Sequence, residues 1–311
     1  MSQLALYGGE KAKKTPFGKG KRFGAEELQQ LKEALEQNTL FYWSGNKVKE
    51  FTSKFAGKYG VPYCVAASSG TAALHVALGA VGVTTGDEVI TAPVTDMGSI
   101  IGILYQNAIP VFADIDPHTY NMDPKSIEKN ITEKTKAIMV VHLAGNPAEM
   151  DAIMAIAKKH DIKVIEDCAQ SYLSYYKGRL AGTIGDIGCF SLNDFKHISA
   201  GDGGMLIMKD EVSYKKAFRF ADKNYDRFSR DPMAMRKIEF LAPNYRMNEL
   251  TGAVGLAQLD RLDEICRKRN VYGEKISEGI RNLPGIYIPK VEEGNKSSYW
   301  FYMMRVNEEE A

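Results

Sequence analysis

The segment "TKAIMVVHLAGNPAEMDAIMAIAKKHDIKVIEDC", residues 135–168, decides the fold that we expect for this chain. Two short apolar runs, 135–141 and 162–168, flank a stretch at 148–161 in which apolar residues recur at helical spacing. Short, continuously apolar runs with turn residues at their ends are typical of strands that helices cover on both faces. The segment therefore predicts a strand, a helix and a second strand parallel to the first.

The same alternation continues on both sides of this segment. Upstream, we expect a strand at 63–68, a helix at 71–81, a strand at 87–92, a helix at 97–107 and a strand at 109–114. Downstream, the runs at 188–192 and 204–208 predict two further strands with a loop between them. The chain is therefore expected to adopt an α/β fold, in which helices sandwich a mainly parallel, doubly wound sheet.

The pattern changes after Pro243. Apolar residues at helical spacing predict one long helix, and the runs at 285–289 and 298–306 resemble strands that begin a smaller domain. We therefore expect three parts: an N-terminal arm at 1–25, a large ligand-binding domain at 26–243, and a helix with the start of a small C-terminal α+β domain at 244–311. Because the sequence stops just after a strand, we expect that small domain to be truncated.

Composition excludes several classes of partner. The 311 residues carry 40 Lys and Arg against 39 Asp and Glu, a formal net charge of +1, so no overall field favours nucleic acid or a membrane surface. No apolar stretch approaches the length of a membrane span, and the N-terminus lacks a signal-peptide core. The four cysteines are far apart, with no CxxC pair, so we expect a cytoplasmic protein with neither a disulfide framework nor a metal site.

Two basic stretches leave alternatives open. The stretch "KAKKTPFGKGKRFG" near the N-terminus fits a solvated or dimer-clasping arm, and it also fits contact with an anionic substrate. The aromatic and basic residues 214–237 could cover a diphosphate or form a solvated helix and loop.

The first candidate ligand site is "SSGT", where a predicted strand meets a predicted helix. Ser69, Gly70 and Thr71 lie at this junction, so free backbone N–H groups and the positive end of the helix dipole point to one place. Such a junction can hold a phosphate, and Gly70 allows the backbone to come close to it. The alternative is an ordinary Ser or Thr helix cap. The pattern is not GxGxxG, so a nicotinamide dinucleotide is not indicated.

The second candidate is the acid at the end of the strand 162–168. Asp167 lies at the carboxyl end of that strand, where open α/β sheets place their ligands. A buried carboxylate needs a cationic partner or several donors, and a protonated pyridine nitrogen would be such a partner. The alternative is again a helix cap. Gln170, three residues on, could reach a phenolic oxygen on the same ring.

The third candidate is Lys196, in the loop between the strands at 188–192 and 204–208. An amine that attacks a carbonyl must be partly neutral, and desolvation or a nearby cation favours that form. Ser191 lies five residues before this lysine. Phosphate, pyridinium nitrogen and aldehyde are the three groups by which pyridoxal 5′-phosphate (PLP) is held, and the chain offers a partner for each.

Together these blocks resemble the DegT/StrS-type sugar aminotransferases, which are PLP enzymes of the aspartate-aminotransferase fold (fold type I). The resemblance runs in order through nearly the whole chain and includes "YWSGNKVKEF", "SSGTAAL", "GDEVITAP", "VIEDCAQ", "GDIGCFSLNDFKHISAGDGGM" and "NYRMNEL". It implies transfer of an amino group from glutamate or glutamine to a nucleotide-linked keto sugar or to a keto-cyclitol. The two half-reactions would share one cofactor and give ping-pong kinetics.

The resemblance also assigns residues. It implies that Lys196 forms the internal aldimine, that Asp167 contacts the pyridine nitrogen and that Gln170 lies near the ring oxygen. The phosphate would be held by Gly70, Thr71 and Ser191, next to Ser69. Asn244 of "NYRMNEL" is similar to the asparagine that reaches the phosphate of the neighbouring subunit, which implies a homodimer with shared active sites.

The sequence departs from the family pattern near the ring. The family usually has an aromatic residue stacked on the cofactor, and the matching place here falls on Met97, with Asp96 before it. Related sugar 3-dehydratases carry histidine where Lys196 stands, whereas this sequence reads "KHIS". The alternatives are therefore a PLP-dependent deoxysugar dehydratase or a regulatory homologue with impaired catalysis. His197 could be a second acid or base, or a hydrogen-bonded loop histidine.

Overall fold

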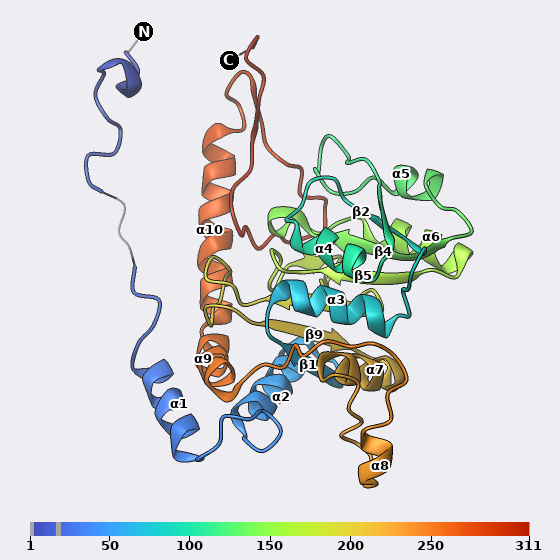
Figure 1. Ribbon diagram of the computed structural model, residues 1–311. Coiled ribbons are helices and arrows are strands. Elements are labelled where there is room, and N and C mark those ends of the chain that lie inside the picture. The colour runs from blue at the N-terminus through green and yellow to red at the C-terminus, as the bar shows by residue number, and fades with distance from the viewer. Residues whose placement is uncertain (1–2, 17–19, 311) are drawn as a thin grey trace.

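The computed structural model describes residues 3–16 and 20–310, and its centre is a seven-stranded sheet (Figure 1). The strand order is β1-β9-β8-β5-β4-β2-β3, with bounds Tyr63–Ala67 (β1), Glu88–Thr91 (β2), Ile109–Phe112 (β3), Thr135–Val141 (β4), Lys163–Asp167 (β5), Ile187–Ser191 (β8) and Gly204–Met208 (β9). Strands β3, β2, β4, β5 and β8 are parallel, and β9 runs antiparallel to both β8 and β1. The mainly parallel sheet expected from the sequence is confirmed.

Helices cover both faces of the sheet. Helices α3 (Gly70–Ala80) and α7 (Glu211–Ala221) share one buried apolar cluster with the sheet, and α2 (Lys47–Tyr59) and α6 (Met150–His160) pack on the opposite face. Strand β4 contributes to the buried clusters on both faces of the sheet, because successive side chains of a strand point to opposite faces. Met139 packs on the α3 side, and Ile138 and Val140 pack on the α6 side. This two-sided burial explains why β4 is apolar from Ala137 to Val141.

The remaining elements are short or lie outside the sheet. They are η1 (Ala5–Tyr7), α1 (Ala25–Glu36), α4 (Gly98–Tyr105), α5 (Pro124–Lys129), η2 (Leu143–Gly145), β6 (Tyr175–Tyr176), β7 (Arg179–Leu180), α8 (Pro232–Met235), α9 (Glu249–Asp260), α10 (Leu262–Ile280), β10 (Ile286–Tyr287) and β11 (Arg305–Val306). The described part of the predicted arm, 1–25, stands apart from the sheet in Figure 1. Residues 1, 2 and 17–19 of that arm, and residue 311, lie outside the described residues. No helix within 3–16 and 20–310 is long and apolar enough to cross a membrane.

The single long helix predicted after Pro243 is wrong, because the structure has two helices, α9 and α10. They meet at Arg261, whose φ of −97° and ψ of −4° leave the helical path and whose N–H donates to Gln258 O (3.1 Å). Helix α9 is fixed by close packing on α2: a Cβ added at Gly255 would lie 2.5 Å from the Phe51 ring. That packing sets the direction of α9, and α10 leaves from the break.

The strand predicted at 298–306 is also largely wrong. Only Arg305 and Val306 pair as β11, with β10. The backbone N–H of Ser298 donates to Gly145 O (3.0 Å), and that of Trp300 donates to Ala144 O (2.9 Å). The segment therefore bonds to the loop after β4 of the large sheet rather than to a neighbouring strand.

Candidate active site

The carboxyl ends of β5 and β8 and the first turn of α3 surround one cavity of about 210 Å³. Its lining includes all the predicted site residues except Met97 and Asn244, namely Ser69, Gly70, Thr71, Asp167, Gln170, Ser191 and Lys196. Asp167 ends β5, Ser191 ends β8, and Lys196 lies in the loop that joins β8 to β9. The topology therefore brings together residues that are more than one hundred positions apart in the sequence.

The N-terminus of α3 is arranged to hold an anion. Ser69 caps the helix, since its Oγ accepts from Ala72 N–H (3.0 Å), so the capping alternative describes the local structure. The helix nevertheless opens onto the cavity, and a Cβ added at Gly70 would lie 2.5 Å from Ser191 Cβ. Because only glycine permits this approach, the Ser191 hydroxyl lies beside the free N–H groups of the first turn.

Asp167 is buried, with 5% of its surface exposed. Its Oδ2 accepts from the Ser99 hydroxyl (2.7 Å), and its Oδ1 accepts from Ala169 N–H (3.0 Å). Burial raises the pKa of this carboxyl, while the two hydrogen bonds and the charge of Lys196 act in the opposite direction. No Lys or Arg of the described residues forms an ion pair with it, so a cationic ligand would find an unpaired acid here.

Gln170 presents a donor to the same cavity. Its Oε1 accepts from Ala144 N–H (2.7 Å), and the side chain is buried. This bond fixes the orientation of the amide and leaves its NH₂ group for an acceptor on a ligand. Contact of Gln170 with a ring oxygen stays a prediction.

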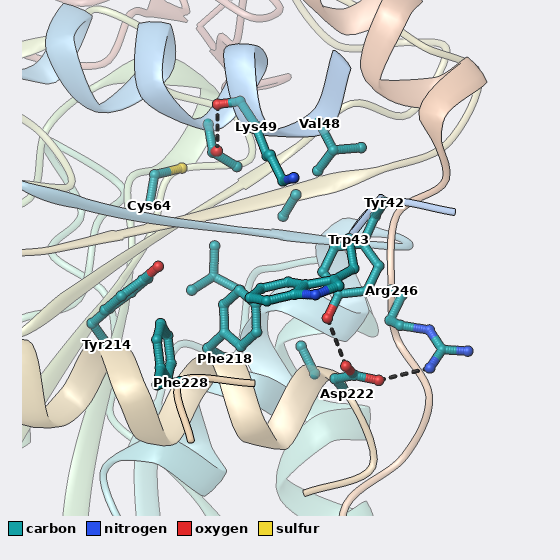
Figure 2. A pocket seen from close by; sticks show the side chains of 14 residues that line it. Tyr42, Trp43, Val48, Lys49, Cys64, Tyr214, Phe218, Asp222, Phe228 and Arg246 are labelled. Carbon is teal, nitrogen blue, oxygen red and sulfur yellow. Dashed lines mark hydrogen bonds and ion pairs between the residues drawn. The ribbon is translucent and has the colours of Figure 1, made fainter. Parts of the chain in front are cut away.

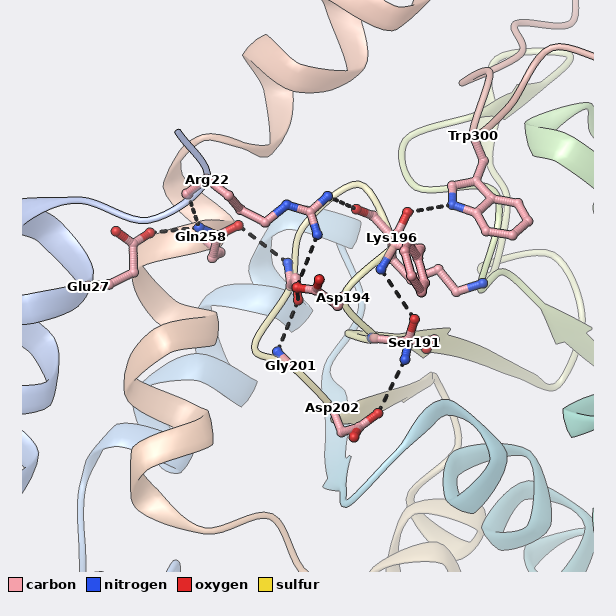
Figure 3. A network of polar contacts seen from close by, with 12 residues as sticks. Arg22, Glu27, Ser191, Asp194, Lys196, Gly201, Asp202, Gln258 and Trp300 are labelled. Carbon is pink, nitrogen blue, oxygen red and sulfur yellow. Dashed lines mark hydrogen bonds and ion pairs between the residues drawn. The ribbon is translucent and has the colours of Figure 1, made fainter. Parts of the chain in front are cut away.

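Lys196 is 9% exposed, and its burial lowers the pKa of the amine, an effect that nearby Asp167 and Asp96 oppose. Sequence analysis missed an aromatic neighbour of this lysine, Trp300. The Lys196 Nζ lies 3.8 Å from the centroid of the Trp300 ring, and the indole N–H donates to Phe195 O (2.8 Å; Figure 3). The residues around Trp300 read as a strand, so no local signal pointed to this contact.

Met97 and Asn244 do not line this cavity. Met97 is 58% exposed, and the residue before it, Asp96, faces the cavity instead. Asp96 Oδ1 accepts from Gly98 N–H (2.8 Å). In this arrangement the turn into α4 directs the acid towards the cavity and leaves Met97 outside its lining, and a role of Met97 against a cofactor ring stays a prediction. Asn244 is exposed, on a segment that pairs with Asp222.

His197 points away from this cavity. It is buried, and its Nε2 lies 3.1 Å from Ser298 O. Burial lowers the pKa of this imidazole to about 3. The structure thus favours the hydrogen-bonded loop histidine over a second acid or base.

A separate buried cluster lies on the other face of β5. His142, Glu166 and Cys168 bring their side chains close enough to suggest a metal site. His142 Nε2, however, bonds to Glu166 Oε2 (2.9 Å), and His142 Nδ1 accepts from Ala148 N–H (3.0 Å). The carboxylate also accepts backbone N–H groups from the loop at 182–185. The cluster is a satisfied hydrogen-bond network that holds this loop to the sheet.

The aromatic stretch 214–237 lines a second cavity of about 180 Å³ (Figure 2). Tyr214 and Phe218 of α7 line it together with Tyr42 and Trp43, and the Phe218 ring packs against the Tyr42 and Trp43 rings. At its rim, Asp222 accepts from the Tyr42 hydroxyl (2.6 Å) and pairs with Arg246 (2.7 Å) and Arg227 (2.7 Å). The stretch is therefore neither a fully solvated helix nor part of the Lys196 cavity.

Several known proteins are similar to this chain in sequence and in fold. The sequence is 37% identical over 291 residues to the putative L-glutamine:3-amino-2,3-dideoxy-scyllo-inosose aminotransferase of Streptoalloteichus tenebrarius, covering 91% of this chain and 68% of that protein. It is 36% identical over 278 residues to GDP-perosamine synthase of Escherichia coli O157:H7, covering 88% and 73%. The crystal structure of the aminotransferase from Psychrobacter cryohalolentis superimposes with a TM-score of 0.89 at 34% identity, covering 94% of this chain and 78% of that one.

The dehydratase alternative is represented by a more distant neighbour. The E. coli GDP-4-keto-6-deoxy-D-mannose-3-dehydratase with bound hydrated PLP has a TM-score of 0.85 and 26% identity, covering 93% of this chain and 78% of that one. The sequence model of the DegT/DnrJ/EryC1/StrS aminotransferase family matches residues 21–311. With this match and relatives above 30% identity, the chain belongs to the DegT/DnrJ/EryC1/StrS aminotransferase family.

Proposed function

We propose that this aminotransferase uses PLP to transfer an amino group from glutamate or glutamine to the ketone of a nucleotide-linked sugar or of a cyclitol. The observation that carries the proposal is the shared cavity, in which one buried lysine, one buried acid and one helix N-terminus converge. The named relatives act on substrates of both acceptor classes, which is why the proposal keeps both.

The residues present fit the cofactor. The N-terminus of α3, with Gly70, Thr71 and Ser191, offers donors for a phosphate. Asp167 offers a buried carboxylate without an ion-pair partner among the described residues, which suits a protonated pyridine nitrogen. When bound, PLP supplies an electron sink for the substrate's α-carbon.

Lys196, Asp167 and Ser99 would then have separate roles in the reaction. The Lys196 amine would hold the cofactor covalently and, once released by the amino donor, would carry a proton as a general base. Burial, which lowers the pKa of this amine, favours the neutral form that both roles need. Asp167 would stay ionised against the ring, and Ser99 would keep its carboxylate in position through the 2.7 Å hydrogen bond.

We further propose a homodimer in which Asn244 completes the site of the partner subunit. Asn244 is exposed and lies outside the cavity of its own chain, so its amide is available to another molecule. The aromatic cavity beside Asp222 lies next to Asn244 and would be close to the same contact region.

The test is a reconstitution of the full chain with PLP, followed by incubation with glutamate or glutamine and a panel of keto sugars and keto-cyclitols. Mass spectrometry of the products should show amination of at least one acceptor, and borohydride reduction should leave the cofactor attached to Lys196. Lys196→Ala should abolish both results. Transamination by that variant at the wild-type rate would falsify the assignment of Lys196.

The same assay separates the alternatives. A deoxysugar dehydratase would release water from a keto-deoxysugar without fixing nitrogen in the product. A regulatory homologue would bind the cofactor and turn over none of the acceptors.

A further inference from the structure

Trp300 reaches the Lys196 amine from the far end of the sequence. Its ring centroid lies 3.8 Å from Lys196 Nζ, a distance typical of a cation over an aromatic face. Figure 3 shows the lysine side chain running beneath the indole. Lys196 lies in the loop between β8 and β9, whereas Trp300 lies in the C-terminal segment between β10 and β11. Their contact therefore links the C-terminal segment to the candidate active site.

Hydrogen bonds of the Trp300 indole and of its backbone hold this residue to both sides of the site. Its N–H donates to Phe195 O (2.8 Å), next to the lysine itself. The backbone N–H of Trp300 donates to Ala144 O (2.9 Å), and Ala144 N–H in turn donates to Gln170. The Trp300 carbonyl accepts from Arg269 Nη1 (2.6 Å). The ring is therefore placed relative to the Lys196 loop and to the Gln170 side of the cavity at once.

The contact with the Trp300 ring partly replaces the interactions with water that the Lys196 amine loses on burial. Lys196 is 9% exposed, so its ammonium form has given up most of its water. Within the described residues no carboxylate forms an ion pair with it, although Asp96 and Asp167 line the same cavity. The negative face of the indole, 3.8 Å from the amine, thus stabilises its charged form together with Asp167 and Asp96.

We propose that Trp300 is a positioning residue that holds the Lys196 side chain while the amine is not bound to the cofactor, and that its ring stabilises the ammonium form that the amine takes once it has accepted a proton. This inference rests on the proposed function, in which the lysine is released and recaptured in every cycle. The indole gives the released side chain a defined position at the wall of the cavity that Lys196 lines. The indole face offsets part of the cost of burying the charged amine, whose pKa burial still lowers.

The experiment measures the protonation of Lys196 in the full chain without cofactor. Competitive acetylation at a series of pH values, read by peptide mass spectrometry, gives the pKa of each lysine amine. The variants are Trp300→Leu, which keeps apolar bulk without a π face, and Trp300→Phe, which keeps a π face without the indole N–H. The matched control is Trp43→Leu, which removes the only other tryptophan of the chain, 37% exposed and distant from this cavity.

We expect Trp300→Leu to lower the pKa of Lys196 by about 0.5 to 1.5, so that acetylation near neutral pH becomes about three- to thirtyfold faster. Trp300→Phe should retain most of the wild-type value, and Trp43→Leu should leave it unchanged. An unchanged or higher pKa in Trp300→Leu overturns the proposal, because entry of water into the cavity acts in that direction. Equal effects of the Leu and Phe variants also overturn it.

The outcome is independent of the test of function. Far-UV circular dichroism establishes that each variant is folded before its lysines are compared. If the wild-type chain fails to bind PLP or to transaminate, the proposed function fails, whatever the acetylation shows. If it transaminates and Trp300→Leu leaves the pKa of Lys196 in place, only the role of Trp300 fails.

Discussion

At the scale of single residues, burial acts on the two central groups in opposite directions. It raises the pKa of the Asp167 carboxyl and lowers that of the Lys196 amine, so each is pushed towards its neutral form. A bound cofactor with a cationic ring nitrogen would restore the charge of the acid. A ligand with such a charge would therefore stabilise the ionised form of Asp167 against the effect of burial.

Replacement of this acid tests that argument. We expect Asp167→Asn to bind PLP but to lower kcat by about a hundredfold or more, since a neutral amide does not hold the ring nitrogen protonated. Steady-state transamination with glutamate is the measurement, and the exposed Asp260→Asn is the control. Turnover of Asp167→Asn at the wild-type rate would remove the carboxylate from the mechanism.

His197 gives a prediction for the pH dependence of stability. Its pKa is about 3 in the folded chain against an ordinary value of 6.5, so between these values only the unfolded chain binds the proton. Stability is therefore lost as the pH falls through this window, by about 1.4 kcal/mol per pH unit from this one group. Denaturant unfolding at pH 7 and pH 4 measures the loss.

In His197→Gln the loss between these two pH values should be smaller by about 3 kcal/mol, because the amide does not titrate. The exposed His118→Gln should show the wild-type difference. An equal difference in His197→Gln and the wild type would mean that the imidazole is not excluded from protonation by its surroundings.

At the scale of elements, the approach of α3 to β8 depends on one missing side chain. We expect Gly70→Ala to weaken PLP binding and to lower the free energy of unfolding by about 1–3 kcal/mol, because its Cβ would meet Ser191. Gly57→Ala in α2 is the matched control: it has open space around it and should stabilise the chain by up to about 1 kcal/mol. Equilibrium dialysis and denaturant unfolding give the two quantities.

The elements also show where sequence reasoning succeeds. Runs such as 135–141 predict their strand well, since two-sided burial favours apolar residues at most positions and leaves only Lys136 of this run exposed. Helix bounds follow when a capping residue such as Ser69 precedes them. The sequence does not predict the break at Arg261, because apolar residues continue at helical spacing across it. Only the packing of α9 on α2 sets the direction of α9 before the break.

The residues of the candidate site likewise fall into those that the sequence predicts and those that it does not. Asp167, Lys196 and the α3 junction could be found because each lies at the end of a recognisable element. Trp300 could not, because its partners are backbone carbonyls at 144 and 195 and its segment has strand-like composition. Asp96 and Met97 are adjacent, so the choice between them depends on a turn geometry that composition does not encode.

At the scale of the whole molecule, the proposed dimer has a direct test. Lys196→Ala and Asn244→Asp should each be inactive, the second because a negative charge would repel the cofactor phosphate of the partner subunit. If sites are shared, co-expression of the two variants should restore about a quarter of the wild-type activity, because half of randomly formed dimers are mixed and each has one intact site. If Asn244 acts within its own chain, mixing restores nothing.

Strand β5 places Glu166 and Asp167 side by side in the sequence but on opposite faces of the sheet. One carboxylate secures the loop at 182–185, and the other lies beside Lys196. A deletion or insertion of one codon ahead of this pair would exchange their orientations and disable architecture and chemistry together. Lineages of this enzyme should therefore tolerate substitutions between Ile162 and Asp167 far more readily than changes in length.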